Sequence, residues 1–188
     1  MFYNKDIQKA FTLIELLIVV AIIAILAAIA VPNFLEAQTR SKVSRTKADM
    51  RSIATALEAY EVDYNKYPMD TYTRERYFPP GYGGTHIQNY VPLTTPTSFI
   101  TSVPRDVFPY PREEEVLQYF HYKNWDTSYG KAVYQVDVYV AEGVSQDWCL
   151  HSIGPDLLFD GVDWKPVSLQ YDPTNGTVSR GDISRWGP

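Results

Sequence analysis

An almost unbroken apolar stretch near the N-terminus is the strongest pattern in the sequence. In residues 11–31 only Thr12 and Glu15 are not apolar, and this length matches the roughly 20 residues that a helix needs to cross a bilayer. A secretory signal peptide is the alternative, because it also combines basic residues with an apolar segment. The stretch is longer than the apolar part of a usual signal peptide and continues directly into a helical pattern. The pattern therefore predicts a retained transmembrane helix.

A second, amphipathic pattern follows Pro32. Apolar and aromatic residues recur at helical spacing and fall on one stripe of a helix. The stripe consists of Val43, Thr46, Met50, Ile53, Leu57, Tyr60, Tyr64 and Tyr67. Pro68 predicts that the helix ends at Tyr67, and Pro32 predicts a kink within it. The stripe favours packing against the chain's own domain, and a coiled coil with another chain is the alternative.

The rest of the chain has the pattern of loops and short strands. Prolines and glycines crowd residues 68–111 and predict a long irregular connection. Alternating apolar residues predict a strand at 133–140, and shorter strands are predicted at 148–153 and 168–171. Together the patterns predict an α+β fold, in which one long N-terminal α-helix, part transmembrane and part amphipathic, packs on a small antiparallel β-sheet.

Composition and charge exclude several classes of protein. The 188 residues carry a formal net charge of -5, which argues against a protein that grips nucleic acid through its phosphates. Cys149 is the one cysteine in the sequence, so these residues cannot build an intramolecular disulfide or a cysteine-based zinc cluster. The histidines, His86, His121 and His151, lack metal-ligand spacing. With no nucleophile motif or phosphate-binding glycine loop, no catalytic residue is predicted and the chain is not expected to be an enzyme.

Glu15 is the one carboxylate within the apolar stretch. A carboxylate toward the bilayer centre costs on the order of 2.5 to 3.5 kcal/mol on insertion scales, and less near the interface. One interpretation is that Glu15 lies at the interface and reaches water. The more specific interpretation is that proteolysis just upstream creates a positive amine, and that Glu15 of one chain meets the new N-terminus of another. Ala21, Ala24 and Ala28 share a helical face that would allow close approach of neighbouring helices, although alanines are common in any membrane helix.

The residues from Lys9 to Leu26, KAFTLIELLIVVAIIAIL, resemble the class III signal of type IV pilins and type II secretion pseudopilins. The resemblance implies that a prepilin peptidase cleaves between Ala10 and Phe11 and methylates the amine of Phe11, with Ala10 standing where glycine is usual. It also implies that Glu15 acts in filament assembly and that Pro32 bends the helix. The implied parts are a cleaved leader (1–10), a transmembrane and polymerisation helix (11–31), its amphipathic continuation (32–67) and a globular head (68–188).

Orientation and partners also follow from this resemblance. The basic residues from Arg40 to Arg51 would place the C-terminal side in the cytoplasm by simple charge counting. The resemblance overrules that count and implies a single-pass inner-membrane protein with its C-terminal domain in the periplasm. The implied partners are copies of the same chain in a helical filament, the prepilin peptidase, an inner-membrane assembly platform and minor pseudopilins.

A weaker resemblance concerns the C-terminal segment. Residues 150–156, LHSIGPD, and 181–186, GDISRW, look like the end of the major, G-type pseudopilin of type II secretion. In that family the intervening loop binds calcium, which would place the Ile153 carbonyl, Asp156 and Asp182 among the Ca2+ ligands, with Asp160 and Asp163 as further candidates. Oxygen ligands in a flexible loop suit Ca2+. The alternative is a solvated acidic turn, since the sequence has no EF-hand spacing.

The expected function is therefore that of a structural subunit of a periplasmic pseudopilus in a type II secretion system. A type IV pilus subunit remains the alternative, as does a membrane-tethered binding module or enzyme that uses the same signal for insertion.

Overall fold

The computed structural model describes residues 11–70, 86–108, 119–124, 147–158, 170–174 and 180–188. By its internal contacts the chain divides into two compact units, Met1–Gln38 and Thr39–Pro188. The first unit contains the apolar part of a long helix. The second contains the rest of that helix and the small domain that packs against it, and the two units are described in turn.

Helix α1 (Leu13–Tyr64) is 52 residues long and continues through Pro32. It ends three residues before the predicted end at Tyr67. The reason lies in Asn65, which adopts a left-handed conformation with φ of 55° and donates its N–H to the Glu61 carbonyl at 2.7 Å. Asparagine tolerates this conformation better than most residues, and a left-handed residue closes many helices.

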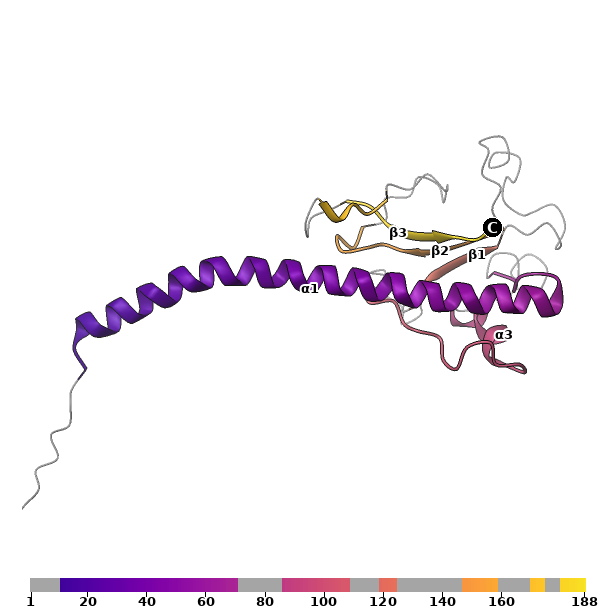
Figure 1. The fold of residues 1–188 in the computed structure, drawn as a ribbon, viewed down its shortest axis with the longest axis horizontal. Coiled ribbons are helices and arrows are strands. Elements are labelled where there is room, and N and C mark those ends of the chain that lie inside the picture. The colour runs from indigo at the N-terminus through magenta and orange to yellow at the C-terminus, as the bar shows by residue number, and fades with distance from the viewer. Residues whose placement is uncertain (1–10, 71–85, 109–118, 125–146, 159–169, 175–179) are drawn as a thin grey trace, which may run out of the picture. The chain divides into compact units, whose positions relative to one another are not determined.

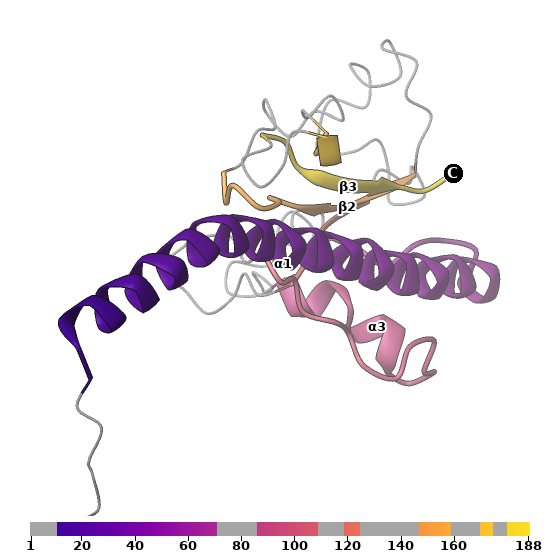
Figure 2. The same ribbon diagram turned by 60° about the vertical axis from the view of Figure 1, so that its left-hand side comes forward.

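The second unit contains a three-stranded antiparallel sheet in the order β1-β2-β3 (Figures 1 and 2). The strands are β1 (His121–Asn124), β2 (Trp148–Ser152) and β3 (Ile183–Trp186). Tyr122 lies opposite Leu150, and Leu150 lies opposite Arg185. In both views the sheet lies along one side of α1 and helix α3 (Val91–Thr94) lies on another side. The predicted α+β fold, with a long N-terminal helix packed on a small antiparallel sheet, is confirmed.

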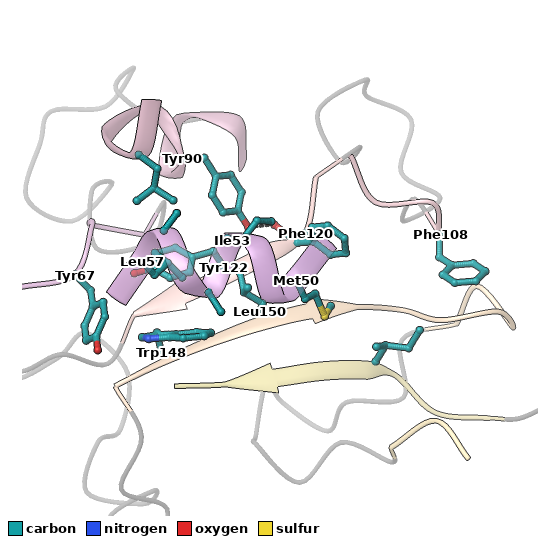
Figure 3. Close-up of a cluster of buried hydrophobic side chains, with 14 of the residues drawn as sticks. Met50, Ile53, Leu57, Tyr67, Tyr90, Phe108, Phe120, Tyr122, Trp148 and Leu150 are labelled. Carbon is teal, nitrogen blue, oxygen red and sulfur yellow. Dashed lines mark hydrogen bonds between the residues drawn. The ribbon is translucent and has the colours of Figure 1, made fainter. Parts of the chain in front are cut away.

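The core between helix and sheet is built from the predicted stripe of α1 (Figure 3). Met50, Ile53 and Leu57 are at most 1% exposed, and burying one such side chain contributes about 1.5 to 3 kcal/mol. They meet aromatic and aliphatic side chains of the sheet and its flanking loops, namely Tyr90, Phe120, Tyr122, Trp148 and Leu150. The stripe weakens toward the end of the helix, where Tyr64 is 42% exposed. In this structure the stripe therefore packs within the chain's own domain.

Glu58 ties the end of α1 to the sheet. Its carboxylate accepts a hydrogen bond from the Trp148 indole N–H at 2.9 Å and another from the Tyr67 hydroxyl at 3.0 Å. The Tyr67 and Trp148 rings also meet edge to face, with centroids 6.4 Å apart. Burial, and then the hydrogen bond with Glu58, raise the pKa of the Tyr67 hydroxyl well above its ordinary value. Because α1 ends at Tyr64, Tyr67 lies beyond the helix and can turn back onto the core.

Several elements predicted from the sequence differ from those in the structure or lie outside the described residues. Two short helices, the 3-10 helix η1 (His86–Asn89) and α3, interrupt the stretch predicted to be irregular. A proline in the first turn of α3 suits its start, because that position needs no N–H donor. Gln170 forms an isolated parallel bridge with Asp182 where the third strand was predicted, and the strand predicted at 133–140 lies outside the described residues.

Candidate functional site

The N-terminal part of α1 exposes apolar side chains around its whole circumference. Exposed fractions run from 45% at Val19 to 86% at Leu13, and the most apolar 18-residue window of the helix is 0% buried in the structure. By length and composition this helix can cross a membrane. Exposed apolar surface on this scale is unfavourable in water. The helix therefore requires lipid or other apolar helices around it.

Glu15 closes the start of this helix through a reciprocal pair of hydrogen bonds with Thr12. Its carboxylate accepts from the Thr12 backbone N–H at 2.9 Å and from the Thr12 hydroxyl at 2.7 Å. The Glu15 N–H in turn donates to the Thr12 hydroxyl oxygen at 3.2 Å. This arrangement is a capping box, in which Thr12 is the cap residue and Glu15 lies three residues on. This role of Thr12 was not among the predictions above, although a threonine three residues before a glutamate is a signal that can be read from the sequence.

Two other residues predicted to act at the N-terminus, Ala10 and Phe11, flank the predicted cleavage point. Ala10, on the N-terminal side of the predicted cleavage point, lies outside the described residues. Phe11, on its other side, is 75% exposed and precedes the helix. Cleavage, methylation and the kink at Pro32 stay predictions.

The residues predicted to bind calcium are brought together in part. Asp182 lies next to the strand pair of Ser152 and Ile183, and a Cβ built on Gly154 would meet the Gly181 carbonyl oxygen at 2.7 Å. The segments around Ile153 and Asp182 are therefore adjacent. One carboxylate oxygen of Asp156 accepts from the Leu158 N–H at 3.2 Å, and the other is buried without a hydrogen-bond partner.

That buried carboxylate oxygen fits a position facing a cation. In the described part of the chain, however, no three His, Cys, Asp or Glu side chains are grouped so as to hold a metal ion. Asp160 and Asp163 lie outside the described residues. Calcium binding at this loop therefore stays a prediction.

Comparison with known sequences extends these observations. A family profile described as the prokaryotic N-terminal methylation motif matches residues 5–31. A second profile, described as type II secretion system protein G, matches residues 33–77. Over its N-terminal region the chain is similar to the type IV pilins and type II secretion pseudopilins. The predicted resemblance is confirmed on the residues that suggested it.

Individual relatives come from both branches of this pilin and pseudopilin family. The chain is 36% identical over 113 residues to the type IV major pilin protein PilA of Myxococcus xanthus, which covers 54% of this chain and 50% of that pilin. It is 44% identical over 61 residues to the type II secretion system core protein G of Pseudomonas aeruginosa, covering 32% of this chain and 43% of that protein. The chain thus spans half or less of the length of these curated relatives. No solved structure matches it.

The head of this pilin-like chain contains a histidine between a serine and a carboxylate. The His151 Nδ1 lies 3.2 Å from the Ser184 hydroxyl, and its Nε2 lies 3.4 Å from an Asp182 carboxylate oxygen. Burial and the charge of Lys123 lower the pKa of His151 to about 4. The imidazole is therefore neutral at neutral pH and too weak a base to activate a serine efficiently. A structural role between β2 and β3 accounts for this row.

Cys149 lies on the same face of the sheet as this row. It is buried in β2, within the strand predicted at 148–153, and pairs in register with Lys123. Burial raises the pKa of the thiol well above its ordinary value and, as the main cause, lowers the pKa of the Lys123 ammonium to about 8. A thiol that stays protonated is a poor nucleophile, so Cys149 acts as a packed core residue.

Proposed function

We propose that this chain is the subunit of a helical filament, assembled from the membrane after cleavage between Ala10 and Phe11 and methylation of Phe11. The observation that carries the proposal is the uncovered apolar helix whose start is capped by Thr12 and Glu15. Such a helix has two suitable surroundings, the bilayer and a bundle of sister helices. Moving from the first to the second keeps its side chains out of water, and the backbone hydrogen bonds remain satisfied within the helix.

The proposed filament is a periplasmic pseudopilus of a type II secretion system. Support comes from the protein G profile over residues 33–77 and from the similarity to a core protein G. The proposed setting is a single-pass inner-membrane precursor with its head in the periplasm, served by a prepilin peptidase, an assembly platform and minor pseudopilins. A type IV pilus subunit is the second candidate, favoured by the longer similarity to a major pilin.

Expression of the full chain with a prepilin peptidase and an assembly platform tests the proposal. We expect mass spectrometry to find a methylated Phe11 at the N-terminus, and electron microscopy to find filaments that contain the chain. An unprocessed chain, or a processed chain that stays dispersed in the membrane, would contradict the proposal and favour a membrane-tethered module. Deletion of the gene in its own bacterium separates the two filament types, because loss of protein secretion indicates a pseudopilus and loss of surface fibres indicates a pilus.

We further propose that the loop after Ile153 binds Ca2+, with the Ile153 carbonyl and Asp156 as ligands and with contributions from Asp160 and Asp182. The buried, unpartnered carboxylate oxygen of Asp156 supports this proposal. When bound, Ca2+ would neutralise the carboxylates of the loop and hold it against the start of β3. The ion would act on stability rather than on chemistry.

Thermal unfolding in Ca2+ and in a chelator measures this effect. At a Ca2+ concentration 100 times its dissociation constant, binding would stabilise the fold by about 2.7 kcal/mol, which corresponds to about 5 to 10 °C for a chain of this size. We expect Asp156→Asn to abolish the difference between the two conditions. Asp172→Asn is the matched control, since the Asp172 carboxylate accepts local hydrogen bonds from Thr174, and it should keep the difference. An unchanged melting temperature of the wild-type chain in chelator would exclude the site.

A further inference from the structure

A small pocket in the head is lined by cations from two elements. Lys47, Met50 and Arg51 line it from α1, and Ser184 and Arg185 line it from β3. Its volume is 180 Å³, enough for a carboxylate or another small anion. The three cationic side chains are exposed, whereas Met50 is only 1% exposed and forms an apolar wall.

The fold dictates that these cations converge. Lys47 and Arg51 are four residues apart and so lie on the same face of α1. Arg185 is the register partner of the fully buried Leu150, and residues paired across strands project from the same face of a sheet. Arg185 therefore projects from the helix-facing side of the edge strand β3, toward Lys47 and Arg51.

The charges of the pocket are not balanced within the described head. No carboxylate of the described residues lies within ion-pair distance of Lys47, Arg51 or Arg185. The Lys47 ammonium has a weaker contact, 5.8 Å from the centre of the Tyr171 ring. Three like charges around one small space repel one another, and an anion bound between them would remove that repulsion.

An acidic counterpart occurs on the same helix. Asp63 is exposed, has no ion pair among the described residues and follows Val62, which is 78% exposed. It lies 12 residues after Arg51, about 18 Å along the helix axis, and about 120° around the helix from it. Asp63 thus cannot reach the pocket of its own chain.

Two complementary patches on different sides of one subunit are what a repeating head-to-tail contact requires. The exposed Asp63 carboxylate matches the pocket, because it can meet the three cations that line it. We propose that the pocket binds the Asp63 carboxylate of a second copy of this chain. This inference rests on the proposed filament and identifies one contact between its subunits.

Reversal of the two charges tests the contact in filaments of the full, processed chain. We expect Arg51→Glu and Asp63→Arg each to reduce filament yield by roughly tenfold or more, because each places like charges together. The double variant should restore most of the yield, as expected for residues that interact directly. Lys42→Glu is the matched control, since it makes the same charge change on α1 outside the pocket, and it should leave the yield near that of the wild-type chain.

Cross-linking gives a second readout that does not depend on yield. Two differently tagged chains, one with Arg51→Cys and the other with Asp63→Cys, should join through a short bismaleimide in mixed filaments. Wild-type filaments give the background, because Cys149 is buried. Normal assembly of Asp63→Arg, or no rescue by the double variant together with no cross-link, would overturn the inference while wild-type filaments still upheld the proposed function. Failure of the wild-type chain to assemble would instead remove the proposed function itself.

Discussion

Replacing Glu15 by alanine is expected to abolish filament assembly while N-terminal processing continues. In the proposed filament the methylated amine of Phe11 is surrounded by apolar helices, where Glu15 of a neighbouring chain is its countercharge. Removing one partner of a buried ion pair leaves the other charge uncompensated, which costs about 3 to 5 kcal/mol. That cost corresponds to more than about a hundredfold in the association constant. Filament yield by shearing and electron microscopy, with the N-terminal mass measured on the same cells, checks both parts of the prediction.

The capping box gives this prediction a sharper form, because Glu15 has two separable roles. Its carboxylate accepts hydrogen bonds from Thr12 within the chain, and its charge is available to a neighbour. Glu15→Gln keeps a side-chain oxygen that can cap the helix but removes the charge. We expect Glu15→Gln to fail in assembly as Glu15→Ala does, whereas Thr12→Ser, which keeps the capping hydroxyl, should assemble. Normal filaments from Glu15→Gln would show that capping is the role of Glu15 in assembly.

The long helix was predictable because its signals are local. An unbroken apolar stretch and a stripe at helical spacing can be read without knowing the fold, and both are present in α1. The end of the helix was misplaced because Pro68 is the more obvious stop, while Asn65 closes the helix by its backbone conformation. Glu15 is conspicuous as a lone carboxylate in an apolar stretch, whereas its partner Thr12 is a common residue whose capping role depends on its spacing from Glu15.

The sheet was less predictable because its burial depends on distant partners. Strand β1 contains Lys123 and Asn124, which are 7% and 8% exposed and read as surface residues in the sequence. The Asn124 side-chain amide donates to the Pro68 carbonyl at 2.9 Å, so a loop more than 50 residues away makes its burial possible. Strand β3 has no alternation of apolar residues, and its place is set by pairing with β2. Such contacts are determined by tertiary structure and leave no local pattern.

Tertiary contacts also predict that adding a single methyl group at Gly187 lowers the stability of the fold strongly. A Cβ at this position would collide with the five-membered part of the Trp148 indole, at Nε1, Cε2 and Cδ1. The backbone cannot easily retreat, because the Gly187 N–H donates to the Trp148 carbonyl at 3.0 Å and the Asp147 N–H donates to the Pro188 carbonyl at 2.9 Å. The ring is also fixed, being 1% exposed and bound to Glu58.

Gly187→Ala should therefore displace Trp148 and break its hydrogen bond to the end of α1. We expect a loss of about 3 kcal/mol in the free energy of unfolding, at the upper end for overpacking, or about 6 to 12 °C in melting temperature. Combining it with Trp148→Phe, which removes the colliding atoms, should make the added alanine much less costly. Thermal unfolding of the wild-type chain, the two single variants and the double variant measures this coupling. An equal loss of stability from Gly187→Ala with Trp148 and with Phe at position 148 would show that the indole is not what Gly187 accommodates. A lower cost of Gly187→Ala in the Trp148→Phe background would show that the junction of α1, β2 and the C-terminal residues is tightly packed. One added methyl group there would then be enough to loosen the helix from the sheet.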